Sequence, residues 1–145
     1  MNTAINIENI SKSFPGVLAN DSVSFDITSG TIHAIVGENG AGKSTLMKIL
    51  YGMQKPDNGT LKINGDIAKF QSPKDAIASG IGMVHQHFML ADNLTVWENI
   101  VLGIDGSNLS KIKRSKYIPE ISDLSKKYSL PIDVNLTIDD LGVGE

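Results

Sequence analysis

One stretch of the sequence gathers three glycines, a lysine and two hydroxyl side chains within nine residues, the run GENGAGKST at 37–45. The spacing from Gly37 to Gly42-Lys43-Ser44 fits the pattern G-x-x-x-x-G-K-[ST]. Small residues let successive backbone N–H groups turn inward around an anion, and a helix that begins near Lys43 would point its positive dipole end at the same place. Lys43 adds a full positive charge, and the Ser44 hydroxyl is the kind of hard oxygen ligand that Mg²⁺ prefers. The pattern therefore predicts a loop that holds the phosphates of a nucleotide.

Such a loop needs a strand before it and a helix after it, and the sequence offers both. The β-branched, apolar run TIHAIV at 31–36 favours a strand buried on both faces. Apolar residues at helical spacing follow over 44–52, where Gly52 is placed to end the helix. The run IGMVHQ at 81–86 predicts a second apolar strand. This context argues against a mere glycine-rich turn with a surface lysine.

The remaining elements are indicated by alternation, turn residues and caps. Residues 23–27 alternate apolar and polar side chains, as a half-buried strand does, and the Pro-Gly pair before them predicts a turn. Asn64-Gly65 suits a two-residue hairpin over 60–70. Ser72 and Thr95 are placed to begin helices, and residues 109–130 have a helical apolar pattern. The order predicts an α/β fold with an antiparallel β subdomain and a helical subdomain.

Composition narrows the class of protein. The 145 residues are 41% hydrophobic and 20% charged, which is ordinary for a globular domain, and the net charge of −3 gives no general attraction to nucleic acid. There is no cysteine, so disulfides and thiolate metal sites are excluded. The first residues lack the basic and apolar regions of a secretion signal, and no apolar run approaches the ~20 residues of a membrane helix.

The loop together with GIGMVHQHF and LTVWENIVLG resembles the ATP-binding subunits of ABC transporters, over essentially the whole chain. Within that family, SFPGVLANDSVSF, GMVHQHFML and LGVGE look most like the first ATP-binding half of sugar- and nucleoside-importer ATPases, with VHQHFML leaning toward nucleosides. The resemblance implies a P-loop NTPase core of the ABC ATPase type. It further implies a partial domain over 1–145, with the β subdomain, P-loop and Q-loop core over 1–103 and the helical subdomain over 104–145.

The resemblance also implies roles for individual residues. Lys43 and Gln86 are implied to be catalytic, and Ser44 and Gln86 to contact Mg²⁺. The ABC signature motif is matched by residues 141–145. The residues implied to bind ATP are Phe14, which would stack on adenine, and Gly37, Glu38, Asn39, Gly40, Ala41, Gly42, Lys43, Ser44 and Thr45.

The implied partners are membrane permease subunits, a second ATP-binding domain in the same longer protein and, indirectly, a substrate-binding protein. The implied location is the cytoplasmic face of the cell membrane, reached through the permease. No nucleic-acid partner is expected.

Two departures from the family pattern affect activity. The signature has Gly142 where the family usually has serine, which removes a hydroxyl expected to contact the γ-phosphate bound by the opposite domain. No apolar run followed by Asp-Glu occurs in residues 1–145, so the Walker B segment is missing and the sequence looks truncated. We therefore expect weak binding of Mg-ATP, little hydrolysis and an exposed apolar sheet edge.

Other functions stay open at this point. A soluble ABC-type nucleotide switch in translation or repair would share the same loop, and so would a non-catalytic fragment that acts by interaction. A GTPase is disfavoured, because no Asn-Lys-x-Asp motif occurs.

Overall fold

The computed structural model describes residues 2–85, 89–102, 113–130 and 132–141. The chain divides into two compact units, Met1–Val84 and His85–Glu145. Among the described residues, no helix is both long enough and apolar enough to cross a membrane.

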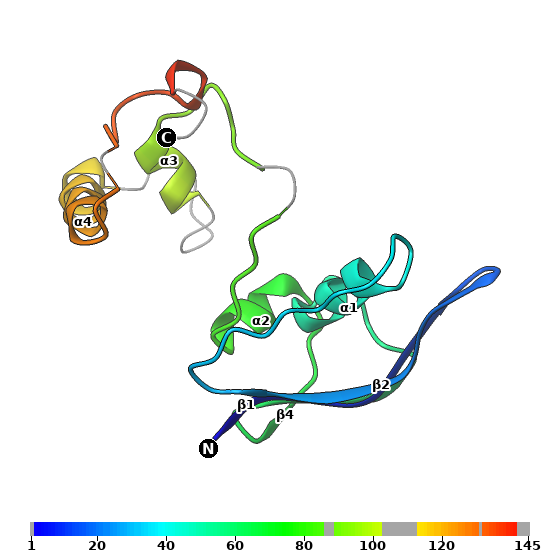
Figure 1. Cartoon of the computed structure of the whole chain (residues 1–145). Coiled ribbons are helices and arrows are strands. Elements are labelled where there is room, and N and C mark those ends of the chain that lie inside the picture. Colours follow the sequence, from blue (N-terminus) through cyan, green and yellow to red (C-terminus); the bar gives the residue numbers. More distant parts are fainter. Residues whose placement is uncertain (1, 86–88, 103–112, 131, 142–145) are drawn as a thin grey trace. The chain divides into compact units, whose positions relative to one another are not determined.

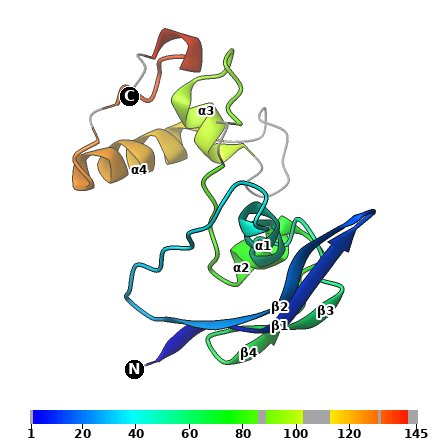
Figure 2. The ribbon, with the colours of Figure 1, turned by 45° about the vertical axis from the view of Figure 1, so that its right-hand side comes forward.

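The first unit is built on a four-stranded antiparallel sheet (Figure 1, Figure 2). Its strands are β1 (Thr3–Phe14), β2 (Val17–Thr28), β3 (Asn58–Ile63) and β4 (Asp66–Ala68), in the spatial order β2-β1-β3-β4. β1 pairs with β2 along its whole length, but its pairing with β3 ends at Ser11. The tip of the β1–β2 hairpin therefore projects beyond the rest of the sheet, as Figure 1 shows.

The predicted turns are confirmed. Phe14 pairs with Val17 across a turn in which Gly16 has a φ of 78°. Asn64 and Gly65 join β3 to β4 with φ angles of 52° and 94°, the two left-handed residues that a type I′ turn requires.

Helix α1 (Lys43–Leu50) supplies the core of the first unit and lies on one face of the sheet (Figure 2). Its apolar residues form a buried cluster with residues of β1 and β3, namely Ile7, Ile10, Leu46, Ile49, Leu50 and Leu61. As predicted, Gly52 is the C′ residue that follows the helix: its φ is 74°, and its N–H donates to the Ile49 carbonyl at 3.0 Å. Burial of this face fixes the axis of α1, and hence the direction of its first turn.

Helix α2 (Pro73–Ala78) has Ser72 as its N-cap and Pro73 as its first residue, as the sequence predicts. The Asp75 carboxylate accepts the backbone N–H groups of Gln71 at 2.7 Å and Ser72 at 2.9 Å. These hydrogen bonds lower the pKa of Asp75 below its usual 3.8, and the bond from the Gln71 N–H has the largest effect. The carboxylate thus closes the start of the helix.

The two predicted buried strands at 31–36 and 81–86 are wrong as far as the structure describes them. Residues 31–36 and 81–85 have no strand conformation, and Ile32, Val36 and Val84 are almost fully exposed. None of the four strands of the sheet pairs with either segment, so neither becomes part of a ladder. The apolar sequence is there, but no described strand pairs with it.

The second unit contains helices α3 (Val96–Val101) and α4 (Arg114–Lys127) and the short 3-10 helix η3 (Ile138–Asp140). Trp97, Val101, Ile121 and Val134 form its buried cluster. Thr95 begins α3 as predicted: its N–H donates to Glu98 Oε2 at 2.8 Å, and its hydroxyl accepts from the Glu98 N–H.

The helical pattern expected over 109–130 is partly confirmed. α4 covers 114–127 of it, and residues 109–112 lie outside the described residues. Ile121 is buried in the cluster, whereas Leu124 and Tyr128 are exposed.

Candidate functional site

The predicted phosphate loop leads directly into α1. Gly42 is the residue before the helix, with a φ of 80°, and its carbonyl accepts the Leu46 N–H at 2.9 Å. A Cβ atom at Gly42 would lie 1.9 Å from the backbone oxygen of Ala19 on β2. Only glycine allows this close approach of loop and strand, because any side chain would collide with backbone. The loop is thereby seated against the projecting hairpin.

The first turn of α1 has free amide donors. Within the described residues, the N–H groups of Lys43, Ser44 and Thr45 have no backbone or side-chain acceptor. The start of α3 differs, because the Val96 and Trp97 amides donate to carbonyls of a neighbouring segment. Open first-turn amides carry the positive end of the helix dipole, so this end of α1 is suited to an anion.

The Lys43 side chain folds back across the loop. Its ammonium Nζ donates to the carbonyl oxygens of Gly37 and Glu38, both at 2.7 Å. The two backbone carbonyls thus hold the Lys43 ammonium against the start of the loop. A phosphate group would be a stronger, charged acceptor for the same ammonium.

The loop and the hairpin line an open pocket of about 410 Å³. Its lining residues are Phe14, Val17 and Ala19 from the hairpin, and Asn39, Gly40, Ala41, Gly42, Lys43, Ser44 and Thr45 from the loop and α1. The pocket is apolar on the side of the hairpin and rich in donors on the side of the helix. It can therefore hold a flat ring at one end and an anion at the other.

Phe14 is the aromatic residue of this pocket, and it is 38% exposed. The ammonium of Lys12 lies 5.8 Å from the centroid of its ring, and the same ammonium forms a 2.6 Å ion pair with Asp57. That hydrogen bond, with a smaller contribution from the backbone N–H of Ser13, lowers the pKa of Asp57 below its usual 3.8.

The structure gathers most, but not all, of the predicted site. Gly37 and Glu38 contribute their carbonyls to Lys43 and are not among the residues that line the pocket. Gln86 and residues 142–145 of the predicted signature lie outside the described residues. Ser44 is exposed and lines the pocket. Among the described residues, no group of three or more His, Cys, Asp or Glu could hold a metal ion.

Sequence reasoning missed Val17 and Ala19 as wall residues of the pocket. The Pro-Gly turn contained a signal for Val17, because a two-residue turn pairs the residue before it with the residue after it, here Phe14. Ala19 carries no local signal, since its place depends on how the hairpin packs against the loop.

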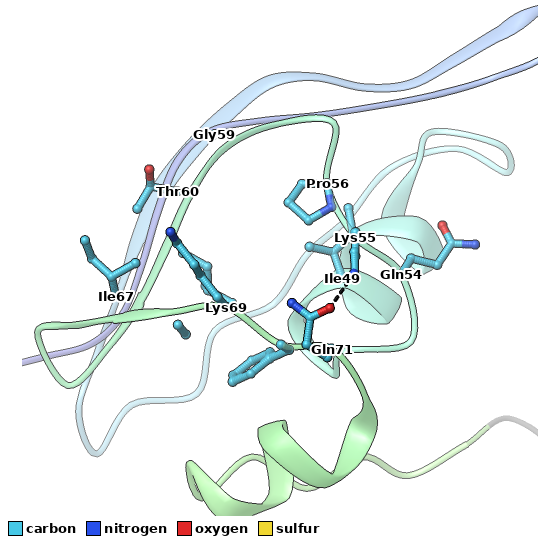
Figure 3. Close-up of a pocket in the computed structure, with 12 residues that line it drawn as sticks. Ile49, Gln54, Lys55, Pro56, Gly59, Thr60, Ile67, Lys69 and Gln71 are labelled. Carbon is cyan, nitrogen blue, oxygen red and sulfur yellow. Dashed lines mark hydrogen bonds between the residues drawn. The ribbon is translucent and has the colours of Figure 1, made fainter.

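A second pocket of about 400 Å³ lies between the end of α1 and the β3–β4 hairpin (Figure 3). Its wall carries the ammonium groups of Lys55 and Lys69, and Lys55 donates to the side-chain oxygen of Gln71. Its other walls include the apolar side chains of Ile49 and Ile67. This pocket is lined by neither the glycine loop nor the first turn of α1, so it lacks the anion-binding amides of the first pocket.

Comparison with known proteins bears directly on these features. A family model described as ABC transporter matches residues 20–142. The guanosine import ATP-binding protein NupO of Bacillus subtilis is 44% identical over 99% of this chain and 28% of its own length. The glucose import ATP-binding protein TsgD13 of Haloferax volcanii is 41% identical over 97% of this chain and 31% of its own. The chain thus spans less than a third of the length of these curated relatives.

A similar solved structure is the ADP conformation of MJ1267, an ATP-binding cassette of an ABC transporter. It superposes with a TM-score of 0.80 at 25% identity, and the match covers 98% of this chain and 59% of that one. The fold predicted from sequence, an α/β fold of the ABC ATPase type, is confirmed.

Proposed function

Because the chain belongs to the ABC transporter family, we propose that its glycine-loop pocket binds Mg-ATP as part of the ATP-binding subunit of an importer. The observation that carries this proposal is the pocket itself. It places an aromatic ring, a lysine ammonium and the free amides of a helix N-terminus around one space of about 410 Å³. Apolar lining with a few convergent polar groups is typical of sites for small molecules.

Each part of the pocket has a role in this proposal. Phe14 stacks on the adenine ring, and the amides of Lys43, Ser44 and Thr45 receive the phosphates. Lys43 leaves the carbonyls of Gly37 and Glu38 and pairs with phosphate oxygens, which are stronger acceptors. Ser44 offers its exposed hydroxyl to Mg²⁺, whose charge would offset that of the phosphates.

Catalysis is assigned to Lys43 and Gln86. In this proposal Lys43 stabilises charge on the transferred phosphoryl group. Gln86 contacts Mg²⁺ or the attacking water and couples the site to the membrane subunit. We propose further that residues 1–103 hold the nucleotide core and residues 104–145 the helical subdomain that leads to the signature.

The transported substrate is proposed to be a nucleoside or a sugar, as in the names of the relatives. The proposed partners are permease subunits, a second ATP-binding domain and, indirectly, a substrate-binding protein. The chain would then act at the cytoplasmic face of the membrane through the permease. Co-purification with membrane permeases supports this proposal, whereas co-purification with ribosomes supports the alternative of a nucleotide switch.

Isothermal titration of the chain with Mg-ATP tests the nucleotide proposal, with Lys43→Ala as the decisive variant. Loss of a charge-assisted contact to phosphate is expected to weaken binding by about tenfold or more. Lys48→Ala is the matched control, because Lys48 is exposed in the last turn of the same helix. Equal affinity of the Lys43 variant and the unsubstituted chain would contradict the proposed site.

A further inference from the structure

The position of Phe14 is not fixed by the sheet alone. β1 pairs with β3 only as far as Ser11, which lies opposite Asn58. Beyond that point Lys12, Ser13 and Phe14 pair with β2 only. A two-stranded ribbon is marginally stable by itself, so the ring at its end needs a further restraint to stay in register with the loop.

Asp57 supplies contacts at the place where β3 stops. It is the residue before β3, and its own N–H donates to the Ser11 carbonyl at 2.8 Å. Its carboxylate uses both oxygens on the ribbon: Oδ1 accepts from Lys12 Nζ at 2.6 Å, and Oδ2 accepts from the Ser13 N–H at 2.7 Å. The carboxylate therefore replaces the missing ladder partner on this edge of β1.

Lys12 connects this contact to the aromatic ring. Its ammonium is shared between the Asp57 carboxylate and the Phe14 ring, whose centroid is 5.8 Å away. The Lys12 side chain is only 18% exposed, so the ammonium is held in place more firmly than in a typical surface pair. Ring, ammonium and carboxylate thus form a chain of contacts from Phe14 to the residue before β3.

We propose that Asp57 and Lys12 are positioning residues that hold Phe14 at the base end of the nucleotide pocket. The proposal rests on the proposed function, since it assumes that Phe14 stacks on the base. It assigns to Asp57 and Lys12 no contact with the nucleotide: neither residue lines the pocket, and both act through the ring. Their effect should therefore depend on the base and not on the phosphates.

The test compares two probes, Mg-ATP and inorganic Mg-tripolyphosphate, by titration of the full chain followed in NMR spectra. Asp57→Ala and Lys12→Met should each lower the affinity for Mg-ATP by about fivefold. This is the lower end of the loss expected when one base no longer stacks on an aromatic ring. Both variants should bind tripolyphosphate like the unsubstituted chain. Asp57→Asn, which keeps an oxygen acceptor for the Ser13 N–H, should give a smaller loss.

Glu8→Gln is the matched control. Glu8 forms the other ion pair recorded on this sheet among the described residues, with Lys62 at 2.9 Å, and it does not contact the ribbon tip. It should leave both affinities unchanged. In addition, the double variant Asp57→Ala/Phe14→Ala should bind Mg-ATP no more weakly than Phe14→Ala alone, because Asp57 acts only through the ring.

The outcomes separate this inference from the nucleotide proposal. Unchanged Mg-ATP affinity in Asp57→Ala, or equal losses for Mg-ATP and tripolyphosphate, would overturn the positioning role. Additive losses in the double variant would do the same. Failure of Lys43→Ala to weaken either probe would instead reject the phosphate site, and the positioning role with it. Since Asp57 lies at the surface, its variants are expected to fold, and Asp57→Asn provides the gentler change if Asp57→Ala does not.

Discussion

At the scale of single residues, the geometry of the candidate site depends on a glycine that leaves no room for a side chain, as well as on the side chains that line the pocket. Gly42 brings the loop into contact with β2 because it has no Cβ, and this contact seats the first turn of α1 beside Phe14. The spacing of Gly37, Gly42, Lys43 and Ser44 predicted a glycine loop that leads into a helix, which the structure shows, and its binding of phosphate stays a prediction. Phe14 was assigned to the proposed base end only through the family resemblance. The places of Ala19 in the pocket wall and of Asp57 beside the β1–β2 ribbon were not predictable, because they depend on how strands and loop pack.

Two glycine substitutions distinguish the cost of a left-handed φ angle from the cost of a collision between a new Cβ atom and the backbone. Gly40 and Gly42 both have left-handed φ angles, 85° and 80°, but a Cβ at Gly40 would meet no atom within 4 Å. Gly40→Ala should therefore lose only about 1–2 kcal/mol of unfolding free energy, the ordinary left-handed penalty. Gly42→Ala adds a backbone collision and should lose about 3 kcal/mol or more.

Urea denaturation of the two variants measures this difference. The Gly42 variant should also lose Mg-ATP affinity, because the loop must move away from β2. Equal destabilisation of the two variants would mean that the contact between Gly42 and Ala19 does not seat the loop.

At the scale of elements, local signals succeeded where a turn or cap is complete within a few residues. Asn64-Gly65, Ser72 and Thr95 each contain their own hydrogen-bonding or φ requirements, and each stands where it was expected. The runs at 31–36 and 81–85 failed as strands because a strand also requires a neighbour, which the local sequence does not supply. An apolar, β-branched sequence is compatible with a strand, but the strand forms only where another strand pairs with it.

The cap of α3 makes a pH-dependent contribution to stability. The Thr95 hydroxyl first, and the Thr95 backbone N–H second, lower the pKa of Glu98 below its usual 4.5. The folded state thus favours the ionised form, so the carboxylate stabilises the fold above its unfolded pKa. This stabilisation is lost as the pH falls through the lower, folded pKa.

Urea denaturation of the unsubstituted chain and of Glu98→Gln tests whether the contribution of Glu98 to stability falls as the pH falls. The variant should unfold at lower urea at neutral pH, because its neutral amide is a weaker acceptor for the cap. The two midpoints should converge as the pH falls into the range where Glu98 becomes protonated. If the difference between the two urea midpoints grew as the pH fell, the expected direction of the pH dependence would be wrong.

At the scale of the whole molecule, the proposal that the glycine-loop pocket binds nucleotide raises the question of whether these 145 residues also hydrolyse it. The 145 residues contain no apolar run followed by Asp-Glu, the pattern that the resemblance to ABC ATPases implies for the metal-holding aspartate and the catalytic glutamate. Phosphoryl transfer relies on positioning and charge neutralisation, which these groups supply. The exposed Ile32, Val36 and Val84 lie in apolar runs that pair with no strand among the described residues.

We therefore expect the 145-residue chain to bind Mg-ATP but to release phosphate no faster than Lys43→Ala does. A coupled assay for inorganic phosphate, run on both proteins at saturating Mg-ATP, makes the comparison. Phosphate release that depends on Lys43 would contradict this expectation, since it would mean that the chain supplies catalytic groups of its own.

The central claim is that nucleotide binds between Phe14 and the first turn of α1, and residue-resolved NMR titration with Mg-ATP tests it most directly. The account predicts that the largest shifts fall on the amides of Lys43, Ser44 and Thr45 and on the ring of Phe14. Shifts centred instead on Lys55, Lys69 and Gln71, around the pocket of Figure 3, would contradict it.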